Sequence, residues 1–160
     1  MIIDTIVIEG EINLIISQQK AFYYLADYSQ DKNWRNEINE TRVLEQQNGT
    51  GTLIEEDTRL SSKVKSHKLV FKCTEYKEPE KVIYETLDSS DYWTKNTREL
   101  VQTGSDTFRL NYKVEFDAAI IKYGLWVSLP KSLIHLFLKH TIKKYLKQFK
   151  KYTEQSISIK

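Results

Sequence analysis

The stretch KSLIHLFLKHTIKKYLKQFKKYTE, residues 131–154, is the part of the sequence that decides the expected fold. Its apolar residues recur every three or four positions, which is the period of one face of an α-helix. This apolar stripe consists of Ile134, Leu138, Ile142, Tyr145, Phe149 and Tyr152, with Leu133 and Phe137 beside it. The opposite side of the helix carries Lys139, Lys143, Lys144, Lys147, Lys150 and Lys151. The stretch therefore predicts one long amphipathic helix that buries its stripe against the rest of the domain.

Segments typical of β-strands precede this helix. The clearest is 107–116, where Phe108, Leu110 and Tyr112 alternate with polar residues, as in a strand with one buried face. We predict strands over residues 5–16, 41–46, 52–60, 64–76, 81–87, 92–102 and 107–116. Polar turns separate most of them by only a few residues, which indicates hairpins and an antiparallel sheet.

Two short helical segments are expected between the first and second strands. Ser17 is a good N-cap for a helix over residues 18–28, and Asp31 can cap a second turn over 34–38. Within the first strand, Gly10 suggests a bulge or a sharp bend.

The composition is that of an ordinary globular domain, with 40% hydrophobic and 29% charged residues. One domain is expected over residues 1–160, and the net charge of +2 argues against a general nucleic-acid binder. Asp4 and Glu9 interrupt the apolar start, so we expect no signal peptide. No apolar run approaches the roughly 20 residues of a membrane span. The single Cys73 cannot form an internal disulfide, which favours a cytoplasmic location.

The order of these elements, with several local sequence marks, resembles the START-like or helix-grip superfamily, also called SRPBCC. The marks are Ile8-Glu9-Gly10-Glu11-Ile12, Tyr24-Leu25-Ala26-Asp27, Trp34 with Ile38, Gly49-Thr50-Gly51-Thr52, Cys73-Thr74-Glu75-Tyr76 with Pro79, Thr107 to Tyr112 with Glu115-Phe116, and Gly124-Leu125 before the last helix. The resemblance implies an α+β domain in which a curved antiparallel sheet of about seven strands grips the C-terminal helix around an apolar cavity. Members include polyketide cyclases and dehydratases, the birch-pollen allergen family and lipid carriers, and only some are enzymes.

Aromatic residues on successive strands are the main candidates for the wall of such a cavity. Tyr84, Trp93 and Tyr112 should line the concave face of the sheet, where aromatic walls suit a flat or sterol-like ligand. The full set of candidate ligand-binding residues is His67, Leu69, Phe71, Tyr84, Trp93, Arg98, Tyr112, Val114, Ile134, Leu138 and Tyr145. The alternative is a filled core, in which these rings pack directly against the helix.

Reactive side chains form no recognisable catalytic motif, so catalytic residues stay unassigned. His67 lies in phase with Leu69 and can be either a general base near a pocket or a hydrogen-bonded rim residue. Arg98 is a candidate partner for a ligand carboxylate. The only other histidines, His135 and His140, do not share a helix face, so no metal site and no cofactor are expected.

The sequence therefore predicts a protein that encloses a small hydrophobic ligand, which is lipid, sterol-like or polyketide-like. One alternative is a cyclase- or dehydratase-type enzyme acting on a polyketide-like chain, and another is a peripheral lipid-transfer module. The lysine row is interpreted as a solvated face, but with the apolar connector 118–130 it can also support peripheral contact with a membrane. That connector is expected to be a lid or an irregular first turn of the last helix, and the protein to be a monomer or homodimer.

Overall fold

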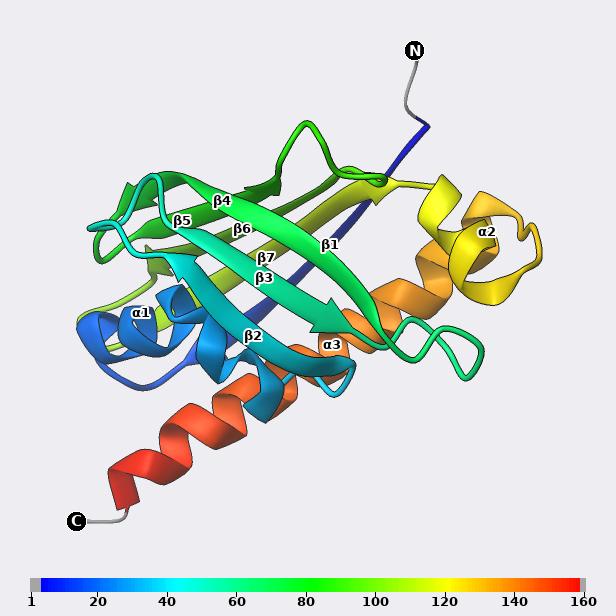
Figure 1. Cartoon of the computed structure of the whole chain (residues 1–160). Helices are drawn as coiled ribbons and strands as arrows, with labels where there is room; N and C mark the ends of the chain where they lie inside the picture. Colours follow the sequence, from blue (N-terminus) through cyan, green and yellow to red (C-terminus); the bar gives the residue numbers. More distant parts are fainter. Residues whose placement is uncertain (1–3, 159–160) are drawn as a thin grey trace.

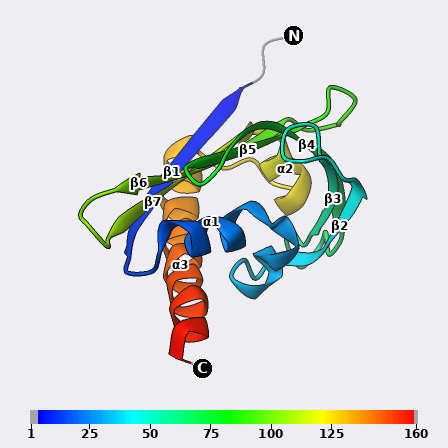
Figure 2. The same cartoon turned by 90° about the vertical axis from the view of Figure 1, so that its left-hand side faces the viewer.

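The computed structural model describes residues 4–158 and has the expected helix-grip arrangement (Figure 1). Within these residues, seven strands form one antiparallel sheet in the order β1-β7-β6-β5-β4-β3-β2. The strands are β1 (Thr5–Leu14), β2 (Ile38–Glu45), β3 (Leu53–Thr58), β4 (His67–Lys77), β5 (Lys81–Thr86), β6 (Thr94–Gln102) and β7 (Phe108–Asp117). The sheet curls from β1 to β2, and the long helix α3 (Lys131–Ser158) packs inside the curl against β1 (Figure 2). The predicted α+β helix-grip class is confirmed.

Three shorter helical segments complete the fold, namely α1 (Gln18–Ala26), the 3-10 helix η1 (Tyr28–Asn33) and α2 (Ala119–Leu125). Ser17 caps α1 as predicted, because its hydroxyl oxygen accepts a hydrogen bond from the backbone N–H of Lys20 at 3.2 Å.

The second helical turn does not lie where it was predicted. The side chain of Asp27, not Asp31, provides the cap, because it accepts a hydrogen bond from the backbone N–H of Ser29 at 3.1 Å. The turn therefore begins directly after α1, and Ile38 is already the first residue of β2. The side chain of Asp31 is fully buried, so it lies in the interior of the protein instead of capping a helix.

Gly10 allows α3 to lie close to β1. The pairing of β1 with β7 is continuous through this position, so the predicted bulge is wrong. A Cβ atom at Gly10 would lie 2.7 Å from Cγ2 of Ile142 and 3.0 Å from Cδ1 of Leu146. The glycine is required because the helix occupies the space that a side chain would need.

The core lies between the concave side of the sheet, α1, η1 and the C-terminal part of α3. Most of the predicted helix stripe is buried or partly buried, and Leu146, which the predicted stripe omitted, is 1% exposed. Leu133 and Phe137, placed beside the stripe, are instead 51% and 67% exposed. The first part of α3 therefore exposes apolar side chains to solvent.

The connector before α3 contains a helix of its own. The carboxylate of Asp117 accepts a hydrogen bond from the backbone N–H of Ala119 at the start of α2, and the helix ends at Leu125, followed by Trp126 in the left-handed conformation with φ of 62°. The hydroxyl of Ser61 donates to the carbonyl of Gly124 at 2.5 Å and ties α2 to the loop before β4. Across residues 4–158, no helix is both long enough and apolar enough to cross a membrane.

Candidate functional site

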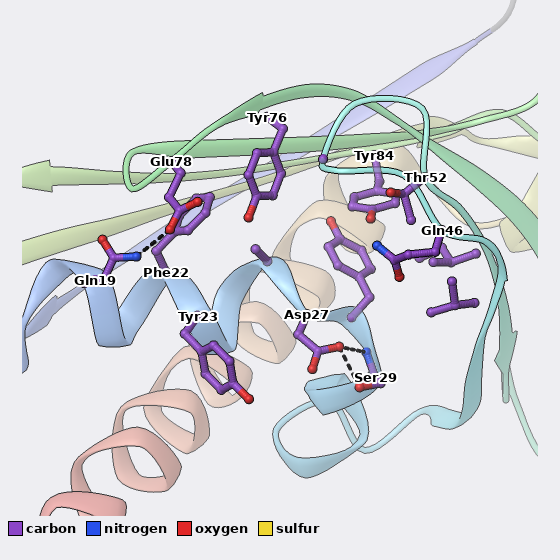
Figure 3. A pocket seen from close by; sticks show the side chains of 15 residues that line it. Gln19, Phe22, Tyr23, Asp27, Ser29, Gln46, Thr52, Tyr76, Glu78 and Tyr84 are labelled. Atoms are coloured by element: carbon purple, nitrogen blue, oxygen red, sulfur yellow. Dashed lines mark hydrogen bonds between the residues drawn. The ribbon is translucent and has the colours of Figure 1, made fainter.

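A cleft of about 350 Å³ lies between α1 and the part of the sheet formed by β2 to β5 (Figure 3). Its walls carry four tyrosines and a few apolar side chains, so we call it the tyrosine cleft. The lining residues are Gln19, Phe22, Tyr23, Ala26, Asp27, Tyr28, Ser29, Val43, Gln46, Gly49, Thr52, Ile54, Tyr76, Glu78 and Tyr84.

Tyr76 reaches the cleft because β4 is irregular. The register between β4 and β5 shifts after Cys73, so that Cys73 opposes Tyr84 and Tyr76 opposes Val82. Since Tyr84 and Val82 lie on one face of β5, the shift brings Tyr76 to the same face as Cys73. There its ring meets Phe22 of α1 edge-on, with the ring centres 5.3 Å apart.

The hairpin turn between β2 and β3 supports the ring of Tyr76. Gly49 has a φ of 92°, a conformation that favours glycine, and a Cβ atom there would lie 2.6 Å from Cγ of Tyr76. The Asn48-Gly49 turn signal in the sequence thus marks one wall of the cleft as well as a strand connection.

Tyr28 and Tyr84 form the deep end of the cleft, with ring centres 4.3 Å apart. Tyr28 is 3% exposed, and its hydroxyl oxygen is buried without a hydrogen-bond partner among residues 4–155. Burial raises the pKa of Tyr28 well above its ordinary value, and outweighs the lowering effect of Arg98. The phenol therefore stays neutral, and a buried polar group of this kind usually has a partner.

Charged and polar groups at the mouth of the cleft are paired with one another. Asp27 accepts hydrogen bonds from the backbone N–H and the hydroxyl of Ser29, at 3.1 and 2.6 Å. The side-chain amide of Gln19 donates to the carboxylate of Glu78 at 2.5 Å (Figure 3). These pairings leave the inner wall largely uncharged, which suits an apolar guest.

A buried ionic network stands behind the tyrosine cleft. The guanidinium of Arg98 donates to both carboxylate oxygens of Asp31, at 3.0 and 2.5 Å, and to the carbonyl of Leu25 at 2.8 Å. It also stacks on the ring of Tyr28, with 3.7 Å between Cζ and the ring centre. Burial is the largest single effect and lowers the pKa of Arg98, but the charges of Asp31, Tyr28 and Tyr112 and the hydrogen bond to Asp31 together raise it, so the net shift is upward. Arg98 is thus neutralised internally, and it fixes the ring of Tyr28.

Arg35 extends this network towards the sheet. It pairs with Asp31 at 2.9 Å and with Glu56 at 3.1 Å, and all three side chains are almost fully buried. Glu37 completes the network at 3.0 Å from Nε of Arg35. Charges that are buried in this way have to be mutually satisfied, because each would otherwise lose its hydration without compensation.

Most predicted site residues share the concave side of the sheet but do not surround one open cavity. Phe71, Tyr84, Tyr112 and Ile134 belong to the core, and Leu69, Val114, Leu138 and Tyr145 pack against it. The ring of Trp34 fills the interior beneath the C-terminal part of α3, because its centre lies 5.9 Å from that of Tyr112 and 5.1 Å from that of Phe149. Of the predicted set, only Tyr84 lines the tyrosine cleft.

Trp93 does not lie on the concave face, and that prediction is wrong. The indole N–H donates to the carboxylate of Glu85 at 2.7 Å. Glu85 pairs with Lys95 on the outer face of the sheet, whereas Thr94 and Asn96 point inward. Side chains alternate along a strand, so Trp93 falls on the outer face with Lys95.

His67 and Cys73 are buried but do not line the tyrosine cleft. His67 contacts the rings of Tyr92 and Tyr123, which stack on each other, and burial lowers the pKa of His67. Its Nε2 atom has no hydrogen-bond partner among the described residues. Burial raises the pKa of Cys73 to about 11, which keeps it a neutral thiol and not a nucleophile. Between residues 4 and 158, histidine, cysteine and acidic side chains form no cluster suited to a metal ion.

A second cleft, of about 460 Å³, lies where α2 and the start of α3 meet the end of β7. Ile134 is the one predicted residue that lines it.

Sequence reasoning missed nearly all of the tyrosine cleft. Apart from Tyr84 and the Asn48-Gly49 turn, only the helix positions Phe22 and Ala26 carried a signal, through their spacing of four.

No family model and no curated protein sequence matches this chain. Solved structures do match over nearly its whole length. A START superfamily protein from Mycobacterium smegmatis has a TM-score of 0.73 at 13% identity, and the match covers 93% of this chain and 97% of that chain. Zhui aromatase/cyclase from a Streptomyces species has a TM-score of 0.70 at 11% identity, with 96% of each chain covered. The di-domain aromatase/cyclase StfQ of the steffimycin pathway has a TM-score of 0.73 at 11% identity, and 53% of that chain is covered. At these identities the likeness establishes the START-like fold.

Proposed function

We propose that this chain, which has the START-like helix-grip fold, binds a small, largely apolar molecule in the tyrosine cleft. The observation that carries the proposal is a cleft of about 350 Å³ whose wall combines apolar side chains with four tyrosines, among them Tyr28 with its buried, unpartnered hydroxyl. Apolar walls with one or two fixed polar groups are the usual composition of small-molecule sites.

The chemistry of the cleft favours an aromatic or polyketide-like guest that carries a hydrogen-bond acceptor. The phenols of Tyr28 and Tyr84 have pKa values raised by burial, so each can donate a proton in a hydrogen bond at neutral pH. Their rings offer flat surfaces for stacking. This location differs from the cavity expected under the C-terminal helix, since Trp34 and the ionic network occupy that space.

A neutral apolar fluorophore with a carbonyl acceptor tests the proposal. The native protein is expected to bind it with a dissociation constant of roughly micromolar order. Ala26→Phe adds a ring to the wall of the tyrosine cleft and should weaken binding at least about tenfold, a cost of about 1.4 kcal/mol. Ala119→Phe makes the same change in the second cleft and is the matched control.

Tyr28→Phe removes only the unpartnered hydroxyl. It should weaken binding about fivefold, the worth of one net hydrogen bond, while leaving the free energy of unfolding unchanged or higher. Binding that survives Ala26→Phe, or that is lost with Ala119→Phe instead, would place the ligand elsewhere.

A cyclase-type enzyme is the second candidate, and the neighbours described as aromatase/cyclases are the observation that favours it. In this cleft, the neutral phenols of Tyr28 and Tyr84 are the donors that can polarise a substrate carbonyl. Incubation with a linear polyketone should then yield a cyclised product lighter by one water, and Tyr28→Phe should slow its formation. Unchanged polyketone after prolonged incubation would leave binding without turnover.

A further inference from the structure

α2 and the first turns of α3 form a corner at one end of the molecule (Figure 1). This corner exposes a group of large apolar side chains. We call these residues the apolar tip; they are Leu125, Trp126, Val127, Leu129, Leu133, Leu136 and Phe137. Trp126, Leu136 and Phe137 are each about two-thirds exposed, at 66%, 69% and 67%. Isolated exposed apolar residues are normal, but a group confined to one end marks an interaction surface.

Every acidic or basic charge in the same part of the chain comes from a lysine. Residues 118–153 contain no Asp or Glu, and they hold eight of the 24 basic residues, leaving 16 basic against 22 acidic residues elsewhere. Among the side chains of residues 4–155, no ion pair engages Lys139, Lys143, Lys144, Lys147 or Lys151. The segment is therefore a strongly positive surface on a protein that is otherwise net negative.

The apolar and basic residues share one outward face of α3. Leu133, Phe137, His140, Lys144 and Lys147 follow one another at spacings of four, three, four and three residues. This repeat keeps them on one side of the helix, opposite the stripe buried on β1. Along that face, the side chains change from apolar at the tip to basic towards the C-terminus.

We propose that this face docks the protein on an anionic phospholipid bilayer, with the apolar tip inserted and the lysines over the headgroups. A bilayer offers an apolar layer directly beneath a negative surface, which matches the order of side chains along α3. Exposed Trp126 beside Lys63, with 4.9 Å between Nζ and the ring centre, has the amphipathic character that suits the membrane interface.

Two other occupants fit the surface less well. A second copy of the chain docked through the same face would bring two unpaired lysine rows together, and like charges at an interface are repulsive. Nucleic acid would satisfy the lysines but would leave the apolar tip in water. The bilayer satisfies both sets of residues at once.

Vesicle cosedimentation tests the proposal, with phosphatidylcholine vesicles compared with vesicles that also contain phosphatidylserine. The native protein should bind the anionic vesicles only, and binding should fall at least about tenfold between about 0.15 M and about 1 M salt. The double variant Leu133→Gln/Phe137→Gln should lose about tenfold or more, because the apolar insertion is removed. The double variant Lys144→Glu/Lys147→Glu should lose at least as much.

Matched controls separate a local docking face from general stickiness. Ile15→Gln/Leu44→Gln removes two exposed apolar side chains at other sites, and Lys65→Glu/Lys68→Glu changes the net charge by the same amount at other sites. Both controls should bind like the native protein, and so should Ala26→Phe, since docking does not require the tyrosine cleft. Failure of the native protein to bind anionic vesicles would overturn the proposal. So would full binding by the Leu133→Gln/Phe137→Gln protein, or equal losses in the controls.

Discussion

At the scale of single residues, the side chain of Arg98 connects separate parts of the protein interior. It is fully buried on a strand position where an apolar side chain is normal, and it joins β6 to the segment after α1 through Asp31. A buried ion pair contributes little net stability over an apolar pair, but it becomes costly when one partner is lost. The pair therefore fixes where Asp31 and Tyr28 lie relative to the sheet.

Arg98→Met should lower the free energy of unfolding by about 3–5 kcal/mol, because the buried carboxyl group of Asp31 loses the partner that binds both of its oxygens. Arg109→Met on the neighbouring strand is the control. Its nearest carboxylate, in Glu11, lies 3.6 Å away at the surface, so less than about 1 kcal/mol is expected. Urea denaturation measures both, and equal small losses would show that the buried pair does not hold the segment.

His67 should make stability depend on pH. Burial lowers its pKa in the folded protein, while Asp91 and Asp57 act weakly in the opposite direction. In the unfolded chain the imidazole takes up a proton near pH 6.5, whereas the folded protein does so only at lower pH. The contribution of His67 to the free energy of unfolding should therefore be complete above about pH 7, and it should decrease as the pH drops towards the pKa of His67 in the folded protein.

His67→Gln should flatten this acid-side decline, because it removes the buried imidazole. Urea titrations between about pH 7.5 and about pH 5 measure the slope in each protein. A native protein whose stability rises on acidification through this range would contradict the assignment.

At the scale of elements, the contact between α3 and β1 determines how closely the sheet grips the helix. Gly10→Ala should destabilise the protein by about 1–3 kcal/mol, because the new methyl group meets Ile142 at 2.7 Å. Ile142→Ala removes that obstacle at the cost of its own burial. The double variant should therefore be more stable than the sum of the single losses predicts, by at least about 0.5 kcal/mol. If thermal or urea unfolding shows that the two single losses simply add, α3 does not lie in close contact with β1 at Gly10.

At the scale of the whole molecule, the sequence was sufficient to predict the seven strands, the closing helix and their order. The alternation of apolar and polar residues in β7, and the polar turns between strands, predict these elements from the local sequence. Trp93, directly before β6, was placed on the wrong face because the inward residues of β6 are polar: Asn96 accepts a hydrogen bond from Tyr112, and Arg98 pairs with Asp31. A hydrophobicity pattern cannot reveal a buried strand face whose polar groups are satisfied by partners remote in sequence.

The tyrosine cleft was hidden for related reasons. Tyr76 faces it only through the register shift after Cys73, and Tyr28 lies in a 3-10 helix that was predicted later in the chain. Trp34 then fills the space in which a ligand was expected. Irregular backbone and long-range packing, which leave no periodic trace in sequence, decided the location of the candidate site.

The most direct test of the central claim is nuclear magnetic resonance mapping of backbone amide shifts as the neutral fluorophore is titrated into the native protein. Binding in the tyrosine cleft predicts saturable shifts at Phe22 and Ala26 of α1 and at Tyr84 of β5, with small changes at Leu138 and Tyr145 of α3. Shifts that centre on Leu138 and Tyr145, or no shifts at saturating fluorophore, would contradict a ligand site in this cleft.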